Sequence, residues 1–432
     1  MSLDRRDLLK WTAAAALAPL FPALAAEEAP PFPGDWAAVR RQFRLTPDRI
    51  HMSAMLFASH PDPVRRAIDT YRAALDADPV ACLERNNDTL LARARTAAGD
   101  YLGVDASHVA LTNSTTESVG LVYGGLLLRR GDEILTTTDH YYVTHEATRL
   151  AAARSGATVR KISLFDNLAN VTANKLADTI VRAVSPRTRV VALTWVHSST
   201  GLKLPIAAIG ARIKQLNANR DPLRPVLLAV DGVHGFGVEN VSFPELGCDY
   251  LMAGCHKWLF GPRGTGIIAA SRQGLDHIDA VIPSFVSERS FGAWIAGREP
   301  SGSIDADTLT PGGFNSYEHL WALPEAFGFH QGIGKAAIAE RTHELASRLK
   351  AGLAKIGGIG LVTPRDPAIS AGIVAFDVEG TNPHAAVRSL RQRGVVASVA
   401  PYASQHVRLT PSILNTPEEV DAALAAVSGL VA

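Results

Sequence analysis

Residues 226–258 read VLLAVDGVHGFGVENVSFPELGCDYLMAGCHKW, and this stretch decides the fold class. It contains two apolar runs, VLLAV and DYLMAG, each of the length of a buried strand. The first run ends at Asp231, and the second leads to Lys257, 26 residues later. In a sheet built from strand–helix units, the carboxyl ends of neighbouring strands face one ligand crevice. We therefore expect a carboxylate and an amine at the same edge of a parallel sheet.

Strand-like runs recur outward from this stretch, with amphipathic helical segments between them, such as residues 63–75, 175–183 and 206–217. The expected strands are residues 108–112, 133–138, 158–162, 190–194, 226–231, 250–254 and 266–270. Alternation at this spacing predicts an α/β large domain, in which a mostly parallel seven-stranded sheet lies between helices.

The pattern changes near residues 310–330, where a Gly-rich loop leads into a long helix. Short strands follow among helices, at residues 374–378, 395–398 and 406–409. We expect a smaller C-terminal α+β domain here. The expected divisions are a signal segment over residues 1–25, a linker and N-terminal arm over 26–47, a large domain over 48–310 whose N-terminal segment contributes to the small domain, and the small domain over 311–432.

The first 25 residues have the features of a targeting segment. Arg5-Arg6 precedes an apolar run too short to span a bilayer, and Ala23-Leu24-Ala25 is a small-x-small cleavage site. This order resembles a twin-arginine signal, cleaved near Ala25, and predicts export to the periplasm by the twin-arginine machinery. The alternative is an ordinary N-terminal helix, which the Pro-rich AEEAPPFPG that follows would break.

Composition argues against several classes of protein. The chain has 432 residues, and without the first 25 it carries 40 basic and 40 acidic residues. With no excess of positive charge, the chain is not expected to bind nucleic acid or to associate stably with a membrane surface. Cys82, Cys248 and Cys255 form no CxxC or Cys/His cluster, so no metal site is expected.

Asp231 and Lys257 together match the requirements of pyridoxal phosphate. A lysine amine forms a Schiff base with that cofactor, and a carboxylate beside the pyridine nitrogen keeps the ring protonated, so that it accepts electrons from the substrate α-carbon. Taken singly, Asp231 could cap a loop and Lys257 could be a surface lysine. Their order, each at the end of a strand, favours the cofactor.

Residues 112–118, TNSTTES, lie between the strand-like HVALT and the helical SVGLVYGGLLL. Hydroxyl groups and free backbone N–H groups at the start of a helix form a cradle for phosphate. The alternative is a plain helix N-cap, because Ser and Thr are preferred there.

These motifs, with DHYY at residues 139–142 and GPRGTG at 261–266, resemble the class V aminotransferase superfamily of fold-type I pyridoxal-phosphate enzymes. The resemblance runs in family order from about residue 48 to the C-terminus. LPEAFGF and RLTPSILNTPEEVD make the layout similar to the isopenicillin N epimerase-like subgroup. Members of that subgroup with twin-arginine signals include a periplasmic enzyme that tailors pyoverdine siderophores.

The resemblance implies three catalytic residues: Lys257 as the Schiff-base lysine, Asp231 beside the pyridinium nitrogen and His140 stacked on the ring face. It implies further contacts to the phosphate from Ser114, Thr115, Thr116 and His256, to the phenolic oxygen from Ser198 and His234, and to the substrate α-carboxylate from Arg408. A planar bidentate guanidinium suits that last task. The alternatives are core histidines for His140 and His234, and a structural ion pair for Arg408.

The sequence departs from the family pattern at three places. Residues 394–408, GVVASVAPYASQHVR, contain no cysteine, although a cysteine desulfurase needs one in this loop as its nucleophile. Gly312-Gly313-Phe314-Asn315 occupies the place of a Gly-Thr-x-Asn loop that reaches the partner subunit's phosphate in many relatives, and Gly254 stands where relatives often have Ser. We expect a weaker or differently built phosphate grip.

The resemblance to the class V aminotransferase superfamily predicts a homodimeric enzyme. It would act on an amino acid, or on the amino group of a small peptide, through an external aldimine and removal of the α-proton. Epimerisation, transamination, elimination and side-chain oxidation all begin in this way, so the motifs leave the reaction type open. The alternatives are a C–S lyase or transaminase of the same fold and, from another class, a non-catalytic exported binding protein.

Overall fold

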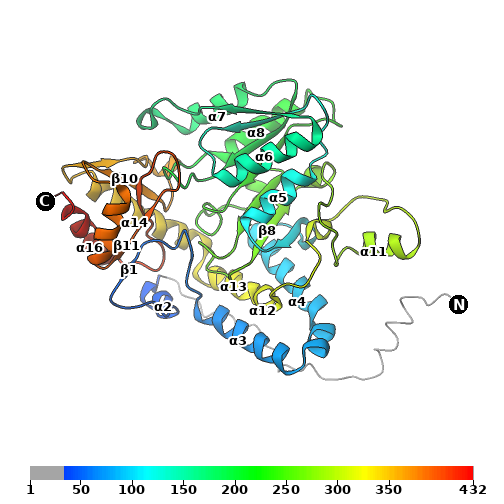
Figure 1. Ribbon diagram of the computed structural model, residues 1–432, viewed down its shortest axis with the longest axis horizontal. Helices are drawn as coiled ribbons and strands as arrows, with labels where there is room; N and C mark the ends of the chain where they lie inside the picture. Colours follow the sequence, from blue (N-terminus) through cyan, green and yellow to red (C-terminus); the bar gives the residue numbers. More distant parts are fainter. Residues whose placement is uncertain (1–33, 432) are drawn as a thin grey trace.

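The structure is a computed structural model that describes residues 34–431, so the predicted signal over residues 1–25 and the start of the linker lie outside the described residues. Figure 1 shows a large sheet with helices on both faces and, beside it, a smaller unit formed by the C-terminal part of the chain. None of the helices within residues 34–431 is both long and apolar enough to cross a membrane.

The large sheet has seven strands in the order β2-β8-β7-β6-β5-β3-β4. They are β2 (Val109–Thr112), β3 (Glu133–Thr137), β4 (Thr158–Ile162), β5 (Thr188–Thr194), β6 (Leu227–Asp231), β7 (Tyr250–Gly254) and β8 (Gly266–Ala270). Only β8 runs antiparallel to its neighbours; the other pairs are parallel. The predicted mostly parallel seven-stranded sheet is therefore confirmed, with strand bounds within two residues of those expected.

Alternate residues of each strand enter one of two cores. In β5, Val191 and Leu193 belong to one core, and Val190 and Ala192 belong to the other. The first core is covered by α3 (Asp62–Ala77), α4 (Pro79–Leu102), α7 (Ala173–Arg182), α8 (Ile206–Asn217), α9 (Phe243–Leu246), α12 (Tyr317–Trp321) and α13 (Leu323–Ile333). The second is covered by α5 (Thr115–Gly125), α6 (Tyr142–Ser155) and α10 (Arg272–Leu275). Because both of their faces are buried, the central strands β6 and β7 are largely apolar, whereas the edge strand β4, TVRKI, is only partly buried.

The C-terminal unit is built on an antiparallel sheet in the order β12-β13-β10-β9. Its elements are α14 (Lys335–Leu353), β9 (Ile359–Leu361), β10 (Val374–Val378), α15 (Pro383–Gln392), β11 (Val395–Val396), β12 (Ser398–Val399), β13 (Val407–Leu409) and α16 (Pro417–Ser428). A separate helix, α11 (Glu288–Ile295), lies on a loop that projects from the large sheet's side of the molecule (Figure 1).

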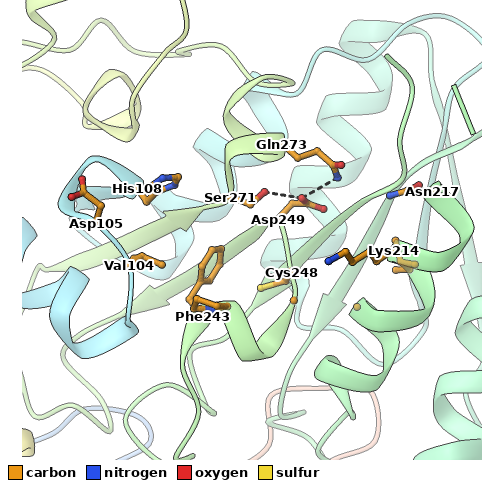
Figure 2. Close-up of a pocket in the computed structure, with 14 residues that line it drawn as sticks. Val104, Asp105, His108, Lys214, Asn217, Phe243, Cys248, Asp249, Ser271 and Gln273 are labelled. Carbon is orange, nitrogen blue, oxygen red and sulfur yellow. Dashed lines mark hydrogen bonds between the residues drawn. The ribbon is translucent and has the colours of Figure 1, made fainter. Parts of the chain in front are cut away.

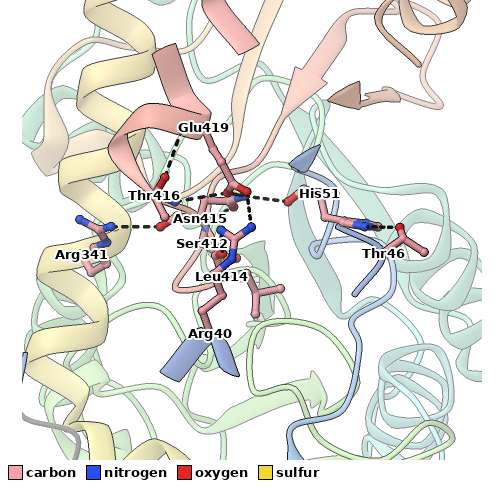
Figure 3. Close-up of polar contacts among 9 residues, drawn as sticks. All are labelled: Arg40, Thr46, His51, Arg341, Ser412, Leu414, Asn415, Thr416 and Glu419. Atoms are coloured by element: carbon pink, nitrogen blue, oxygen red, sulfur yellow. Dashed lines mark hydrogen bonds and ion pairs between the residues drawn. The ribbon is translucent and has the colours of Figure 1, made fainter. Parts of the chain in front are cut away.

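The N-terminal arm joins this C-terminal unit. Strand β1 (Ile50–His51) pairs in parallel with β11. Figure 3 shows the polar contacts beside this pairing: Arg40, from α2 (Trp36–Arg41), forms an ion pair with Glu419, and Asn415 Nδ2 donates to the His51 carbonyl at 3.1 Å. The first described segment of the chain is therefore held by the last.

Candidate active site

A cavity of about 210 Å³ opens at the carboxyl ends of β5, β6 and β7, beside the start of α5. Nine of the ten predicted site residues line it: Ser114, Thr115, Thr116, Ser198, Asp231, His234, His256, Lys257 and Arg408. The tenth, His140, does not. The structure thus gathers residues spread over nearly three hundred positions of sequence around one small space.

Lys257 and Asp231 reach the cavity from adjacent strands, β7 and β6. Burial lowers the pKa of the Lys257 amine to about 8, and the nearby Asp231 charge offsets part of that effect. Within residues 34–431 the amine makes no hydrogen bond or ion pair. Burial also raises the pKa of Asp231, which accepts one hydrogen bond, from the Val233 N–H at 3.2 Å. The cavity therefore contains an amine without a partner and a carboxylate with an oxygen to spare.

A tight turn fixes the backbone of Lys257. The Phe260 N–H donates to the Lys257 carbonyl at 3.0 Å, and Phe260 is the one non-glycine residue within the described chain with positive φ, at 56°. That conformation costs a bulky residue roughly 1–3 kcal/mol. Its ring lies edge-on to Phe43, with centroids 5.2 Å apart, in a buried cluster that holds it there. The lysine is therefore positioned by packing before any ligand binds.

The start of α5 forms an anion-binding end. The Ser114 side chain caps the helix, accepting from the Glu117 N–H at 3.1 Å, and the N–H groups of Thr115 and Thr116 have no partner within the helix. His256 Nδ1 is buried and has no hydrogen-bond partner among residues 34–431. An unpaired nitrogen and a helix N-terminus facing one cavity fit a phosphate group.

Two of the departures from the family pattern have steric causes. A Cβ atom at Gly254 would lie 2.9 Å from Thr115 Oγ1, which accepts from the Gly254 N–H at 2.8 Å. The serine of many relatives would therefore crowd the phosphate end. Gly313 has a φ of 113°, which a threonine rarely adopts.

Trp258 sets the tautomer of His234. Its indole Nε1 donates to His234 Nδ1 at 3.2 Å, so the imidazole proton resides on Nε2. Burial, together with the charges of Lys257 and Arg408, holds the pKa of His234 well below its usual range and keeps the ring neutral. His234 therefore offers an N–H donor. Sequence reasoning missed Trp258, although it directly follows the lysine.

His140 lies behind the cavity wall. Its Nε2 donates to the Ala192 carbonyl at 2.8 Å, and its Nδ1 accepts from the Thr194 hydroxyl at 2.5 Å. Burial lowers its pKa well below the usual value. The neighbouring Tyr141 and Val143 line the cavity instead. This is the setting of a satisfied core histidine, and stacking of His140 on a ring stays a prediction.

Arg408 lines the cavity in a fully buried position. Nη1 donates to the Ser198 carbonyl at 2.6 Å, Nη2 to the Val399 carbonyl at 2.9 Å and Nε to Ser398 Oγ at 3.2 Å. No ion pair within residues 34–431 involves it, and burial lowers its pKa to about 10. A guanidinium has five N–H groups, so one remains on each terminal nitrogen. Two parallel N–H groups match the two oxygens of a carboxylate.

A second cavity, of about 590 Å³, lies at the opposite, amino end of the sheet. Figure 2 shows its buried acid, Asp249, accepting from Ser271 Oγ at 2.8 Å and from Gln273 Nε2 at 3.2 Å. The other oxygen of Asp249 accepts from the Leu228 N–H at 2.8 Å. The fold uses this carboxylate fully, so the smaller cavity is the stronger candidate.

The residues of the smaller cavity fit pyridoxal phosphate. The amine of Lys257 suits its carbonyl carbon, the spare oxygen of Asp231 suits its pyridine nitrogen, and the α5 end suits its phosphate. The three groups lie after β7, at the end of β6 and at the start of α5. Within residues 34–431, the Lys257 amine has no hydrogen-bond partner and Asp231 accepts only one hydrogen bond, from the Val233 N–H.

Comparison with known proteins gives a consistent result. Residues 58–422 match the aminotransferase class-V family. The chain is 28% identical over 400 residues to isopenicillin N epimerase of Streptomyces clavuligerus, covering 90% of this chain and 96% of that protein. It is 27% identical over 428 residues to a probable cysteine desulfurase of Xylella fastidiosa strain 9a5c, covering 92% and 96%.

A solved structure of the cystine C–S lyase C-DES with its product cysteine persulfide shares the fold, with a TM-score of 0.78, 23% identity and coverage of 88% of this chain and 98% of that one. An apo cysteine desulfurase from Thermococcus onnurineus aligns with a TM-score of 0.77 at 20% identity, covering 91% and 98%. Because the family match spans most of the chain and the cavity carries the groups that the cofactor requires, this chain belongs to the aminotransferase class-V family of pyridoxal-phosphate enzymes.

Proposed function

We propose that this chain is an exported enzyme that labilises the α-hydrogen of an amino acid, or of an amino group on a small peptide, as an epimerase or a side-chain-tailoring enzyme in the periplasm. One observation carries the proposal: the amine of Lys257, which has no hydrogen-bond partner within residues 34–431, and Arg408, which keeps one N–H group on each terminal nitrogen, line the same cavity. A base and a carboxylate clamp in one space are what α-proton removal requires.

Each residue then has a defined task. Arg408 binds the substrate carboxylate through its two terminal nitrogens and so orients the α-carbon. Lys257 Nζ removes the α-proton; an amine with a pKa of about 8 can accept and return a proton near neutral pH. Pyridoxal phosphate, when bound, supplies a protonated ring that accepts the electron pair of the α-carbon. Asp231 offers its spare oxygen to the ring nitrogen, and His234 offers its Nε2 proton to the cavity.

The cysteines argue against a desulfurase. None lies in the loop between β12 and β13, which approaches Arg408. Cys255 is fully buried, and burial raises its pKa to about 12. Cys248 lines the cavity at the other end of the sheet. A buried thiol of such high pKa is a poor nucleophile.

Export and dimerisation complete the proposal. Export is supported by the order of Arg5-Arg6, apolar run and cleavage site in the sequence. A homodimer is supported by apolar side chains that the single chain leaves in water: Phe57 is 59% exposed, Tyr142 68% and Phe314 82%. Light scattering on the mature protein would report its mass in solution.

The first test is the visible absorption spectrum of the purified mature protein before and after borohydride. The parent should show a yellow band that borohydride bleaches, and Lys257→Ala should lose or alter it. Lys214→Ala removes the lysine that lines the larger cavity and is the matched control; it should keep the band. Loss of the band in Lys214→Ala alone would indicate that the cofactor binds in the larger cavity, at the other end of the sheet.

The second test measures exchange of substrate α-hydrogen for solvent deuterium across a panel of L- and D-amino acids. Exchange with loss of stereochemistry supports epimerisation. Release of pyruvate or sulfide would instead indicate a C–S lyase, and stoichiometric keto acid would indicate a transaminase. A protein that stays colourless after pyridoxal phosphate is added would be a binding protein, and the enzyme proposal would be dropped.

A further inference from the structure

Tyr402 lies on the loop between β12 and β13, next to Pro401, which lines the cavity. Its hydroxyl is 2.7 Å from Ser198 Oγ, and its ring meets that of Tyr141 edge-on, with centroids 5.9 Å apart. Ser198 and Tyr141 both line the cavity, as does Pro401, the residue before Tyr402. Three segments far apart in sequence therefore meet at one phenol.

The contact between the two hydroxyls has a preferred direction. A phenol is the stronger acid and therefore the better donor, while a serine oxygen is the better acceptor. Burial raises the pKa of Tyr402 to about 12, so it keeps its proton at neutral pH. Within residues 34–431 Ser198 Oγ has no second partner. The hydrogen of Ser198 is then left to point into the cavity that this side chain lines.

The order of the strands indicates which part of the cofactor Ser198 faces. Along the sheet edge, the phosphate end follows β2, Lys257 follows β7, Asp231 ends β6 and Ser198 follows β5. Ser198 and the phosphate end thus lie on opposite sides of Lys257 and Asp231. In pyridoxal phosphate the phenolic oxygen and the phosphate arm flank the carbonyl carbon on opposite sides. A ring held at those points turns its phenolic oxygen toward Ser198.

We propose that Tyr402 is a positioning residue that orients the Ser198 hydroxyl as a hydrogen-bond donor to the phenolic oxygen of bound pyridoxal phosphate. The proposal rests on the proposed function of this cavity. A donor at that oxygen stabilises its anionic form. The tyrosine therefore lowers the pH at which the visible band of the bound cofactor changes, and it strengthens retention of the cofactor.

The test compares Tyr402→Phe, Ser198→Ala and the double variant as holoproteins. Tyr402→Phe keeps the ring against Tyr141 and removes only the hydroxyl. We expect the pH midpoint of the visible band to rise by about 0.5–1 unit, and the dissociation constant of pyridoxal phosphate to rise about two- to tenfold, as for the loss of one hydrogen bond. The double variant should shift no further than Ser198→Ala alone. Circular dichroism confirms that each variant is folded.

Tyr142→Phe is the matched control, because Tyr142 is exposed, lies outside the cavity lining, and its hydroxyl makes no hydrogen bond within the described chain. It should leave the midpoint in place. The charged groups of the cavity, Lys257, Asp231 and Arg408, stay the same in every variant, so a shift reports the hydroxyl alone. A midpoint that moves in Ser198→Ala but not in Tyr402→Phe would overturn the proposal. Additive shifts would overturn it as well. A parent that binds no cofactor would overturn the proposed function itself.

Discussion

At the carboxyl end of the large sheet, Lys257 and Asp231 are buried with few protein partners, whereas at the amino end Glu133 is surrounded by them. Glu133 accepts from Arg160 at 2.8 and 2.9 Å, from the Thr188 hydroxyl at 2.6 Å and from the Ser185 hydroxyl at 3.1 Å. The two carboxylates are buried to a similar degree, with Glu133 2% and Asp231 5% exposed, so burial alone does not identify a site. The difference is whether the partners of the buried groups are present in the protein.

The contrast separates two uses of a buried charge. At the amino end, hydrogen bonds from Arg160 above all hold the pKa of Glu133 down to about 2 against the opposing effect of burial. At the carboxyl end, burial dominates at Lys257 and Asp231 and shifts both pKa values toward the neutral forms. The first arrangement stabilises the fold. The second is unfavourable until a ligand supplies the missing partners.

The largest expected effect is at the carboxyl end. Lys257→Ala should slow exchange of substrate α-hydrogen by about 10²–10⁴-fold, the usual contribution of a positioned general base. The midpoint of urea unfolding of the cofactor-free protein should stay nearly unchanged, because the amine makes no hydrogen bond or ion pair with any other described residue. Deuterium exchange and urea denaturation measure the two quantities. A variant that exchanges as fast as the parent would break the comparison.

Glu133→Gln should have the opposite profile. It breaks the charged hydrogen bonds with Arg160 and should lower the free energy of unfolding by about 2 kcal/mol, since the arginine is partly exposed and solvent screens the pair. The exchange rate per folded molecule should not change. Glu146→Gln, which breaks an exposed pair with Arg149, should lower the free energy of unfolding far less, because solvent screens that pair. Equal losses in the two variants would contradict the distinction.

The contribution of Glu133 should also depend on pH. Its pKa is about 2 in the folded protein, below the ordinary value of about 4.3, so the folded state binds fewer protons. Its stabilisation is therefore fully present above the unfolded pKa and is lost as the pH falls through the folded pKa. The difference in stability between parent and Glu133→Gln should shrink from about pH 5 toward pH 2. Urea midpoints across that range would show it, and a constant difference would argue against the charge.

The smallest effect sharpens the description of the phosphate end. Gly254→Ser should weaken retention of pyridoxal phosphate about fivefold, because the added atoms crowd Thr115 Oγ1 and overpacking costs about 1 kcal/mol or more. Gly120→Ala, inside α5 with no atom within 4 Å of the added Cβ, is the control and should leave retention unchanged. Equilibrium dialysis of the cofactor measures both. Tighter retention in Gly254→Ser would mean that the crowding is relieved by movement of Thr115.

The positions of site residues could be predicted where a local strand pattern is combined with the known topology of parallel sheets. Buried strands are apolar runs of limited length, and parallel strands place their ends at one edge, so Asp231 and Lys257 could be assigned to one site from sequence alone. Nine of the ten predicted residues line the cavity, and four of them, Ser198, His234, His256 and Arg408, were predicted from the family resemblance. His140 follows β3, but its hydrogen bonds to Ala192 and Thr194 hold its side chain outside the cavity lining. No local sequence pattern predicts such contacts.

Residues that act through other residues escaped prediction. Trp258 was adjacent to a recognised motif, and its position beside the lysine was the available signal. Tyr402 had no comparable signal, since it lies on an irregular loop and is separated from Ser198 by 204 positions. A contact between residues so far apart in sequence forms only in the folded chain. The loop has no periodic pattern, so its sequence alone does not reveal this contact.

The pairing of β1 with β11 has a consequence for the timing of folding. Ile50 pairs with Val395, 345 positions later. Chains are synthesised at about 5–20 residues per second, so the arm waits roughly 20–70 s for its partner strand to be made. The contacts of Arg40 with Glu419 and of His51 with Asn415 come later still. The arm is thus among the first segments made and the last to be paired, and a route that accepts only folded protein would have to wait until synthesis is complete.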